Sequence, residues 1–128
     1  MSKRILVADD EPHVLRVLAH SLEREGYEVK TVANGADAYE LVVQAAPDVL
    51  ITDISMPKMT GQTLCERIQE QMPDRQFLIF ILTSRTEIEH REWSAALSNV
   101  KFLEKPVSTR KLLNQLEDYF DLQDASVA

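Results

Sequence analysis

The sequence predicts an α/β protein, a doubly wound parallel sheet with helices on both faces. Short apolar runs alternate five times with segments whose apolar residues recur at helical spacing. Each run is too continuous for a half-exposed strand, which is typical of a parallel sheet covered on both faces. A length of 128 residues with 45% hydrophobic and 27% charged residues fits one ordinary globular domain.

The first half of the chain supplies two strand–helix units. Arg4–Ala8 is the first expected strand, Pro12 suits the first turn of the following helix, and Gly26 suits its end. Residues 27–32 form the second expected strand, and Pro47 ends the second helix. The apolar stripes of these helices are Val14, Leu15, Leu18 and Leu22, and then Ala38, Leu41, Val42 and Ala45.

The third and fourth units follow. Val49–Asp53 is a buried strand with Asp53 at its carboxyl end, and turn residues come directly after it. The most apolar run, Phe77–Leu82, indicates a strand at or next to the centre of the sheet. Thr86 and Glu89 have capping-box spacing and predict the start of the fourth helix. The third helix carries Leu64, Cys65, Ile68 and Met72.

The last unit begins with the strand 100–103, and Ser108 is a suitable cap for the fifth helix. That helix carries Leu112, Leu113, Leu116 and Phe120. We expect a domain over residues 1–122 and a short, frayed tail over residues 123–128.

Composition excludes several functions. A formal net charge of -7 argues against nucleic-acid binding, which needs a basic face. A single cysteine, Cys65, allows no internal disulfide and fits a reducing compartment. The start of the chain has no signal-peptide pattern, and no apolar run approaches the roughly 18 residues of a membrane span. We therefore expect a cytoplasmic protein without membrane contact.

Chemically active side chains gather where the predicted strands end. Asp9 and Asp10 follow the first strand, Asp53 ends the third, Thr83 follows the fourth, and Lys105 follows the fifth. In parallel sheets these ends share one edge, where ligands bind. Three carboxylates together call for a cation such as Mg²⁺. A lysine and a hydroxyl beside it suit a phosphoryl group, and Asp53 is then the natural nucleophile.

This set of residues resembles the receiver domain of bacterial two-component response regulators, over about residues 3 to 120. The matching motifs are Asp9-Asp10, Asp53-Ile54-Ser55-Met56-Pro57, Thr83 and Lys105-Pro106. The resemblance implies a flavodoxin-like fold with strand order 2-1-3-4-5. It also implies a signalling phosphoacceptor rather than an enzyme, with Asp53 phosphorylated by a sensor histidine kinase or a phosphotransfer protein.

The resemblance also implies the roles of the site residues. Asp10 and Asp53 would bind Mg²⁺ directly with the backbone carbonyl of Ser55, and Asp9 would assist. Thr83 would be the switch hydroxyl, Phe102 the switch aromatic, and Lys105 the partner of the phosphoryl group in a cis Lys105-Pro106 bond. A surface of helix 4, strand 5 and helix 5 would change its affinity for an unidentified downstream effector. The chain would be a monomer or a weak homodimer with no effector domain of its own.

Two alternatives remain at this point. A haloacid-dehalogenase-like phosphatase also uses a strand-end aspartate with Mg²⁺, but it needs an acid where Ser55 stands. A receiver-like interaction module that takes no phosphate usually lacks an acid or the lysine, and here all are retained. Within the receiver interpretation, Arg85 is expected to shield the phosphoryl group from water.

Overall fold

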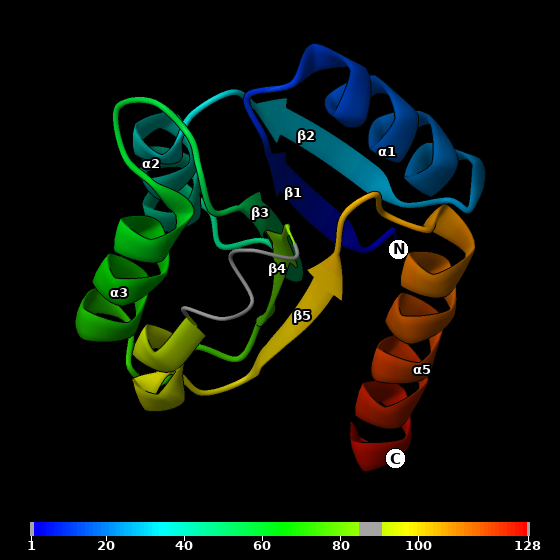
Figure 1. Ribbon diagram of the computed structural model, residues 1–128. Coiled ribbons are helices and arrows are strands. Elements are labelled where there is room, and N and C mark those ends of the chain that lie inside the picture. The colour runs from blue at the N-terminus through cyan, green and yellow to red at the C-terminus, as the bar shows by residue number, and fades with distance from the viewer. Residues whose placement is uncertain (1, 85–90, 128) are drawn as a thin grey trace.

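The computed structural model describes residues 2–84 and 91–127, which form a five-stranded parallel sheet between two layers of helices (Figure 1). The strand order is β2-β1-β3-β4-β5, as the family resemblance implied. All four neighbouring pairs are parallel. The strands are β1 (Arg4–Ala8), β2 (Glu28–Val32), β3 (Val49–Asp53), β4 (Leu78–Thr83) and β5 (Val100–Glu104).

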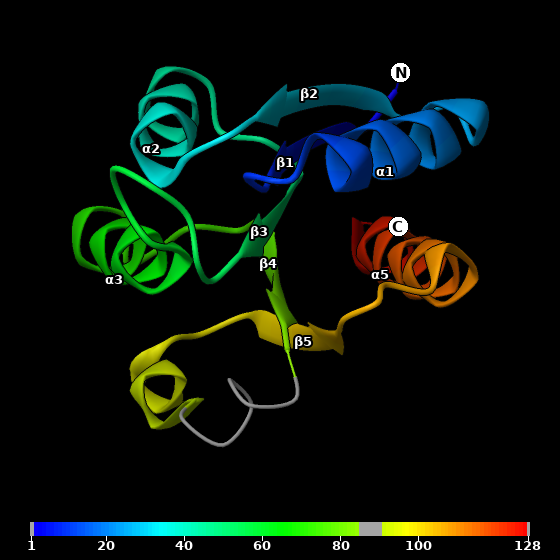
Figure 2. The same ribbon diagram turned by 45° about the horizontal axis from the view of Figure 1, so that its top comes forward.

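The helices divide between the two faces of the sheet. Helices α1 and α5 cover one face, while α2, α3 and the short 3-10 helix η1 cover the other (Figures 1 and 2). Their bounds are α1 (Pro12–Arg24), α2 (Gly35–Gln44), α3 (Gly61–Gln71), η1 (Arg91–Ala96) and α5 (Thr109–Val127). Among the described residues, none of these helices combines the length and the apolar character that crossing a membrane requires.

Successive side chains along each strand point to opposite faces of the sheet and pack into two separate hydrophobic cores. In β3, Val49 and Ile51 point to the α1–α5 layer, whereas Leu50 points to the α2–α3 layer. Every residue of β3 and β4 is buried, and β4 is the most continuously apolar strand of the sheet. Cys65 lies in the α2–α3 core, and burial raises the pKa of its thiol to about 12.

The expected helix signals are present. Pro12 opens α1, and Gly26 closes it with a φ of 93°. The N–H groups of Gly26 and Tyr27 donate to the carbonyls of Glu23 and Leu22, the pairing of a Schellman motif. At α5, the Ser108 hydroxyl accepts the N–H of Lys111 at 3.2 Å.

Some boundaries differ from the prediction. Helix α5 continues to Val127, through residues that the sequence assigned to a frayed tail. Two side-chain contacts reach the start of this last part: Gln123 Nε2 donates to the Tyr119 hydroxyl at 2.9 Å, and Lys3 Nζ lies 3.9 Å from Asp124 Oδ1. Ala45 is exposed and follows α2 instead of extending its apolar stripe.

The start of the fourth helix at Thr86 and Glu89 lies outside the described residues, as does Arg85. The described chain resumes at η1, where Trp93 is partly buried against the α2–α3 core.

Candidate functional site

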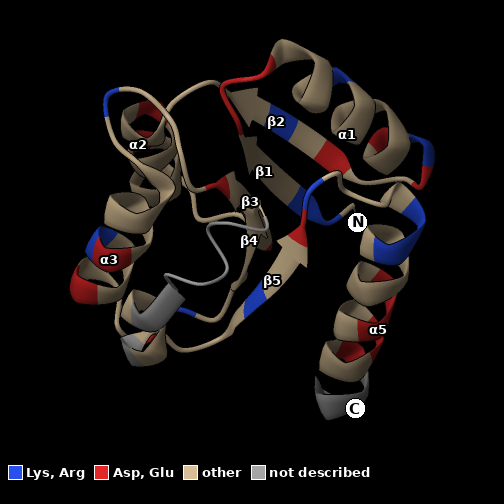
Figure 3. Ribbon diagram, in the orientation of Figure 1, with Lys and Arg blue, Asp and Glu red and all other residues tan. Residues whose placement is uncertain are grey.

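Five of the predicted site residues lie at the carboxyl edge of the sheet. Asp9 and Asp10 follow β1 directly, Asp53 ends β3, Thr83 ends β4, and Lys105 follows β5. Figure 3 shows the acidic segment between β1 and α1 in red. The backbone N–H of Lys105 donates to the Thr83 carbonyl at 2.7 Å, which ties the β5–α5 connection to the end of β4.

Lys105 is the centre of this arrangement. Its Nζ lies 3.1 Å from Asp9 Oδ2, 3.3 Å from Asp53 Oδ2 and 3.3 Å from Glu11 Oε1. The Asp9 contact is an ion pair without good hydrogen-bond alignment, since Asp9 Oδ2 has no hydrogen-bond partner among the described residues. The sequence predicted that Asp9, Asp53 and Lys105 would share one edge of the sheet, but it did not assign Glu11 to the site.

The three aspartates form a compact acidic cluster. One carboxylate oxygen from each of Asp9, Asp10 and Asp53 lies within 4.8 Å of the others. Asp9 and Asp53 are buried, while Asp10 is exposed at the mouth of the cluster. Such closely spaced carboxylate oxygens are the ligand set that Mg²⁺ prefers, with room on the exposed side for its waters. The residues present therefore fit the magnesium ion that the sequence predicts.

Burial controls the electrostatics of Asp53. Desolvation, followed by the nearby Asp9 carboxylate, raises the pKa of Asp53 to about 6. Lys105 and the Ile54 N–H, which donates to Asp53 Oδ1 at 2.8 Å, oppose this shift without cancelling it. A cation at the cluster would relieve the same repulsion.

The pKa of Lys105 is raised by its charged neighbours and not by burial. Burial by itself would lower the pKa of the ammonium group, but the Asp53 and Asp9 carboxylates outweigh burial and raise it. Lys105 therefore stays protonated at any physiological pH. A fixed positive charge beside Asp53 suits a group that carries several negative oxygens.

Thr83 is fully buried, and its hydroxyl oxygen has no hydrogen-bond partner among the described residues. A buried polar atom of this kind calls for an explanation, because leaving it unpaired costs about 1–3 kcal/mol. Phe102 lies in β5, partly buried against the α2–α3 core. Ser55 is exposed in the loop that follows Asp53.

Two glycines, which the sequence reasoning did not single out as site residues, shape that loop. A Cβ atom on Gly61 would lie 1.9 Å from the Asp53 carbonyl oxygen, and one on Gly35 would lie 2.1 Å from the Met59 carbonyl oxygen. The Gly61 N–H instead donates to the Ile54 carbonyl at 2.6 Å. Only glycine allows α2 and α3 to approach the loop this closely, and the approach fixes the backbone of Asp53.

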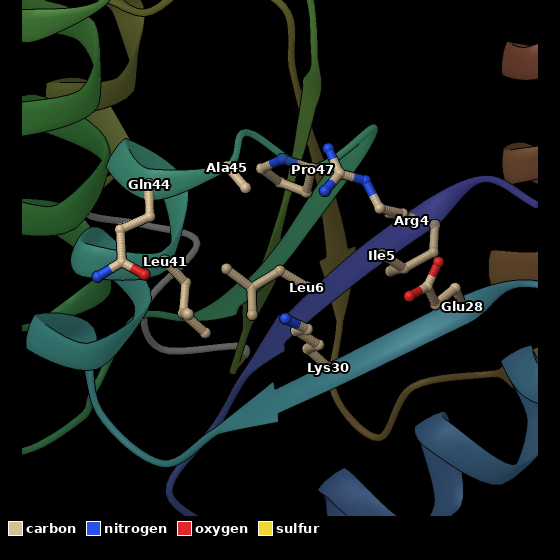
Figure 4. Close-up of a pocket in the computed structure, with 9 residues that line it drawn as sticks. All are labelled: Arg4, Ile5, Leu6, Glu28, Lys30, Leu41, Gln44, Ala45 and Pro47. Atoms are coloured by element: carbon tan, nitrogen blue, oxygen red, sulfur yellow. The ribbon is translucent and has the colours of Figure 1, made fainter.

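Of two cavities in the described surface, one lies apart from the predicted site residues and the other includes Lys105. A small cavity of about 120 Å³ between β1, β2 and α2 includes none of the predicted site residues (Figure 4). A larger groove of about 470 Å³ runs from Lys105 along α1. Its lining is mainly apolar beyond Glu11 and Lys105 and consists of Glu11, His13, Val14, Val17, Leu18, Lys105, Pro106 and Val107.

Comparisons with known proteins agree with this geometry. Residues 5–117 match the family described as the response regulator receiver domain. The chain is 38% identical over 115 residues to the response regulator receiver protein CpdR of Brucella abortus, covering 90% of this chain and 94% of CpdR. It is 32% identical over 112 residues to the alkaline phosphatase synthesis transcriptional regulatory protein PhoP of Bacillus subtilis, covering 88% of this chain.

The chain spans about half of the length of PhoP, with 46% covered. Among solved structures, the chemotaxis response regulator CheY4 of Vibrio cholerae is similar, with a TM-score of 0.82 and 30% sequence identity. That match covers 92% of this chain and 98% of the CheY4 chain. The sequence motifs, the strand order and these matches lead to one conclusion: this chain belongs to the receiver-domain family of two-component response regulators.

Proposed function

We propose that the chain accepts a phosphoryl group on Asp53 from a phosphohistidine of a sensor histidine kinase or a phosphotransfer protein. The observation that carries this proposal is the Lys105 ammonium 3.3 Å from a buried Asp53 carboxylate inside an acidic cluster. In the transfer, an Asp53 carboxylate oxygen bonds to phosphorus while the bond from phosphorus to the histidine nitrogen breaks. The electron pair of that bond returns to the imidazole.

The side chains around Asp53 have distinct roles in this proposal. Lys105 pairs with the phosphoryl oxygens and offsets their charge. Asp10, Asp53 and the Ser55 backbone carbonyl would hold Mg²⁺, with Asp9 assisting, and the ion would neutralise charge on the transferring group. The carboxylate spacing of at most 4.8 Å and the raised pKa of Asp53 support a cation at this position.

A switch is the second part of the proposal. The Thr83 hydroxyl would hydrogen-bond to a new phosphoryl oxygen, and Phe102 would move inward, changing the affinity of the surface of helix 4, β5 and α5 for a downstream effector. The buried Thr83 hydroxyl, which has no hydrogen-bond partner in the described part of the chain, supports this, as does the position of Phe102 beside Ile81 on the neighbouring strand. The unphosphorylated chain would visit the active form at a low population. We place this activity in the cytoplasm and regard the chain as a phosphoacceptor rather than an enzyme.

Phosphorylation can be tested directly. Incubation with phosphoramidate and Mg²⁺ should add one phosphoryl group by intact mass, and peptide mapping after borohydride reduction should locate it at Asp53. Asp53→Asn should remove the label, whereas Asp74→Asn, an exposed aspartate with the same charge change, should keep it. A chain that stays unlabelled in every condition would instead be an interaction module that takes no phosphate.

A further inference from the structure

Lys105 has a third carboxylate partner that the proposed phosphorylation does not need. Glu11 Oε1 lies 3.3 Å from Lys105 Nζ, although the two residues are 94 positions apart in the chain. The Glu11 side chain is 61% exposed, while those of Asp9 and Asp53 are nearly inaccessible. Glu11 therefore holds Lys105 from the solvent side, opposite to the buried aspartates.

Helix capping, the usual role of a side chain at the start of a helix, does not explain the Glu11 side chain. It is the N-cap residue of α1, with extended backbone angles of φ -93° and ψ 109°, but its side chain makes no capping hydrogen bond. Its backbone N–H donates to Asp9 Oδ1 at 2.9 Å, so the main chain of Glu11 is fixed next to the acidic cluster. Serine, threonine, aspartate and asparagine are the usual caps, and glutamate is not among them. The long side chain instead reaches Lys105.

We propose that Glu11 is a positioning residue that competes with the phosphoryl group for Lys105. This inference rests on the proposed phosphorylation of Asp53. In the resting protein the Glu11 carboxylate shares the Lys105 ammonium with Asp9 and Asp53. A phosphoryl group on Asp53 needs that ammonium, so its oxygens must displace Glu11 or share the ammonium with it. Breaking or weakening the Glu11–Lys105 ion pair therefore costs free energy, which makes phosphorylation of Asp53 less favourable.

The competition is measurable with beryllofluoride, a stable mimic of the phosphoryl group. In saturating Mg²⁺, Glu11→Gln should bind beryllofluoride about two- to fivefold more tightly than the wild type, the range expected for an ion pair with one exposed partner. Glu23→Gln is the matched control, because it removes the same charge from an exposed position at the other end of α1. Its affinity should equal that of the wild type. Trp93, the sole tryptophan, offers a fluorescence signal, and ¹⁹F NMR gives an independent one.

A second variant separates the ion pair from a general effect of negative charge. Glu11→Asp keeps the charge but is one methylene group shorter, so it loses the 3.3 Å contact with Lys105. If the contact is what competes, Glu11→Asp should bind beryllofluoride as tightly as Glu11→Gln. Wild-type affinity in Glu11→Asp would overturn the proposal in favour of charge repulsion acting without contact.

The outcomes also separate this inference from the proposed function. If the wild type does not bind beryllofluoride and takes no phosphoryl group, the proposed function fails. If the wild type binds it and Glu11→Gln binds with unchanged or weaker affinity, the role of Glu11 alone is refuted. Thermal unfolding of Glu11→Gln without Mg²⁺ should be cooperative, with a midpoint slightly below that of Glu23→Gln, because the resting protein loses one partly exposed ion pair. A small loss of this kind together with tighter binding would show that Glu11 acts through Lys105, whereas a large loss of stability would make Glu11 a structural residue and overturn the proposal.

Discussion

Asp53→Asn should stabilise the metal-free protein at neutral pH, because the wild-type carboxylate is buried beside another carboxylate. Burial, followed by Asp9, raises the pKa of Asp53 from 3.8 to about 6 in the folded protein. As pH rises, the unfolded chain releases this proton first, and the folded protein holds it until about pH 6. The free energy of unfolding therefore falls as pH rises through the window between these two pKa values.

The size of the effect follows from the shift. Each pKa unit corresponds to about 1.4 kcal/mol, so a shift of about two units makes the ionised Asp53 cost about 3 kcal/mol at pH 7. At pH 5 the cost is about half as large, and near pH 4 it is well below about 1 kcal/mol. Asparagine has nearly the same shape as a protonated aspartate and carries no charge. The variant should gain stability by these amounts.

Urea unfolding in EDTA, followed by circular dichroism at about pH 4, 5 and 7, measures this gain. Asp74→Asn is the control, because Asp74 is exposed and its substitution should leave the free energy of unfolding nearly unchanged at every pH. The reasoning is refuted if Asp53→Asn is no more stable than the wild type at pH 7. A gain of equal size at pH 4 and pH 7 would refute it as well, since the charge would then not be its source.

Three further predictions concern other parts of the site. Asp10→Ala should weaken Mg²⁺ binding at least about tenfold by isothermal titration calorimetry, because a hard cation loses a charged oxygen ligand; an unchanged affinity would exclude Asp10 from the metal site. Thr83→Ala should still accept a phosphoryl group but lose most of the beryllofluoride-induced change in the NMR shifts of β5 and α5; a full change would show that the hydroxyl does not couple the two. Gly61→Ala should lower the free energy of unfolding by about 2 kcal/mol or more and slow phosphorylation, because the new Cβ would lie 1.9 Å from the Asp53 carbonyl oxygen. For that variant, wild-type stability and rate in urea unfolding and phosphoramidate labelling would contradict the close approach.

The strands and their order along the chain were predictable from the sequence, because burial on both faces leaves a direct mark on composition. The runs Val49–Asp53 and Arg4–Ala8 match the observed strands residue for residue. The same pattern located Asp9, Asp53 and Lys105 at strand ends, and a parallel sheet then brings those ends to one edge. The start of α5 was predictable from Ser108 for a local reason, since capping depends on residues within one turn.

Tertiary structure alone decided which carboxylates share Lys105 and how strongly Asp53 is perturbed. Glu11 looked like an ordinary acid at the start of a helix, and only its distance to Lys105 gives it a role. Gly61 looked like a loop glycine, and only the approach of α3 to the Asp53 backbone makes a side chain there sterically unfavourable. The continuation of α5 to Val127 was likewise absent from the local sequence pattern. Composition records burial residue by residue, whereas electrostatic and steric contacts depend on distances between segments that meet only in the folded chain.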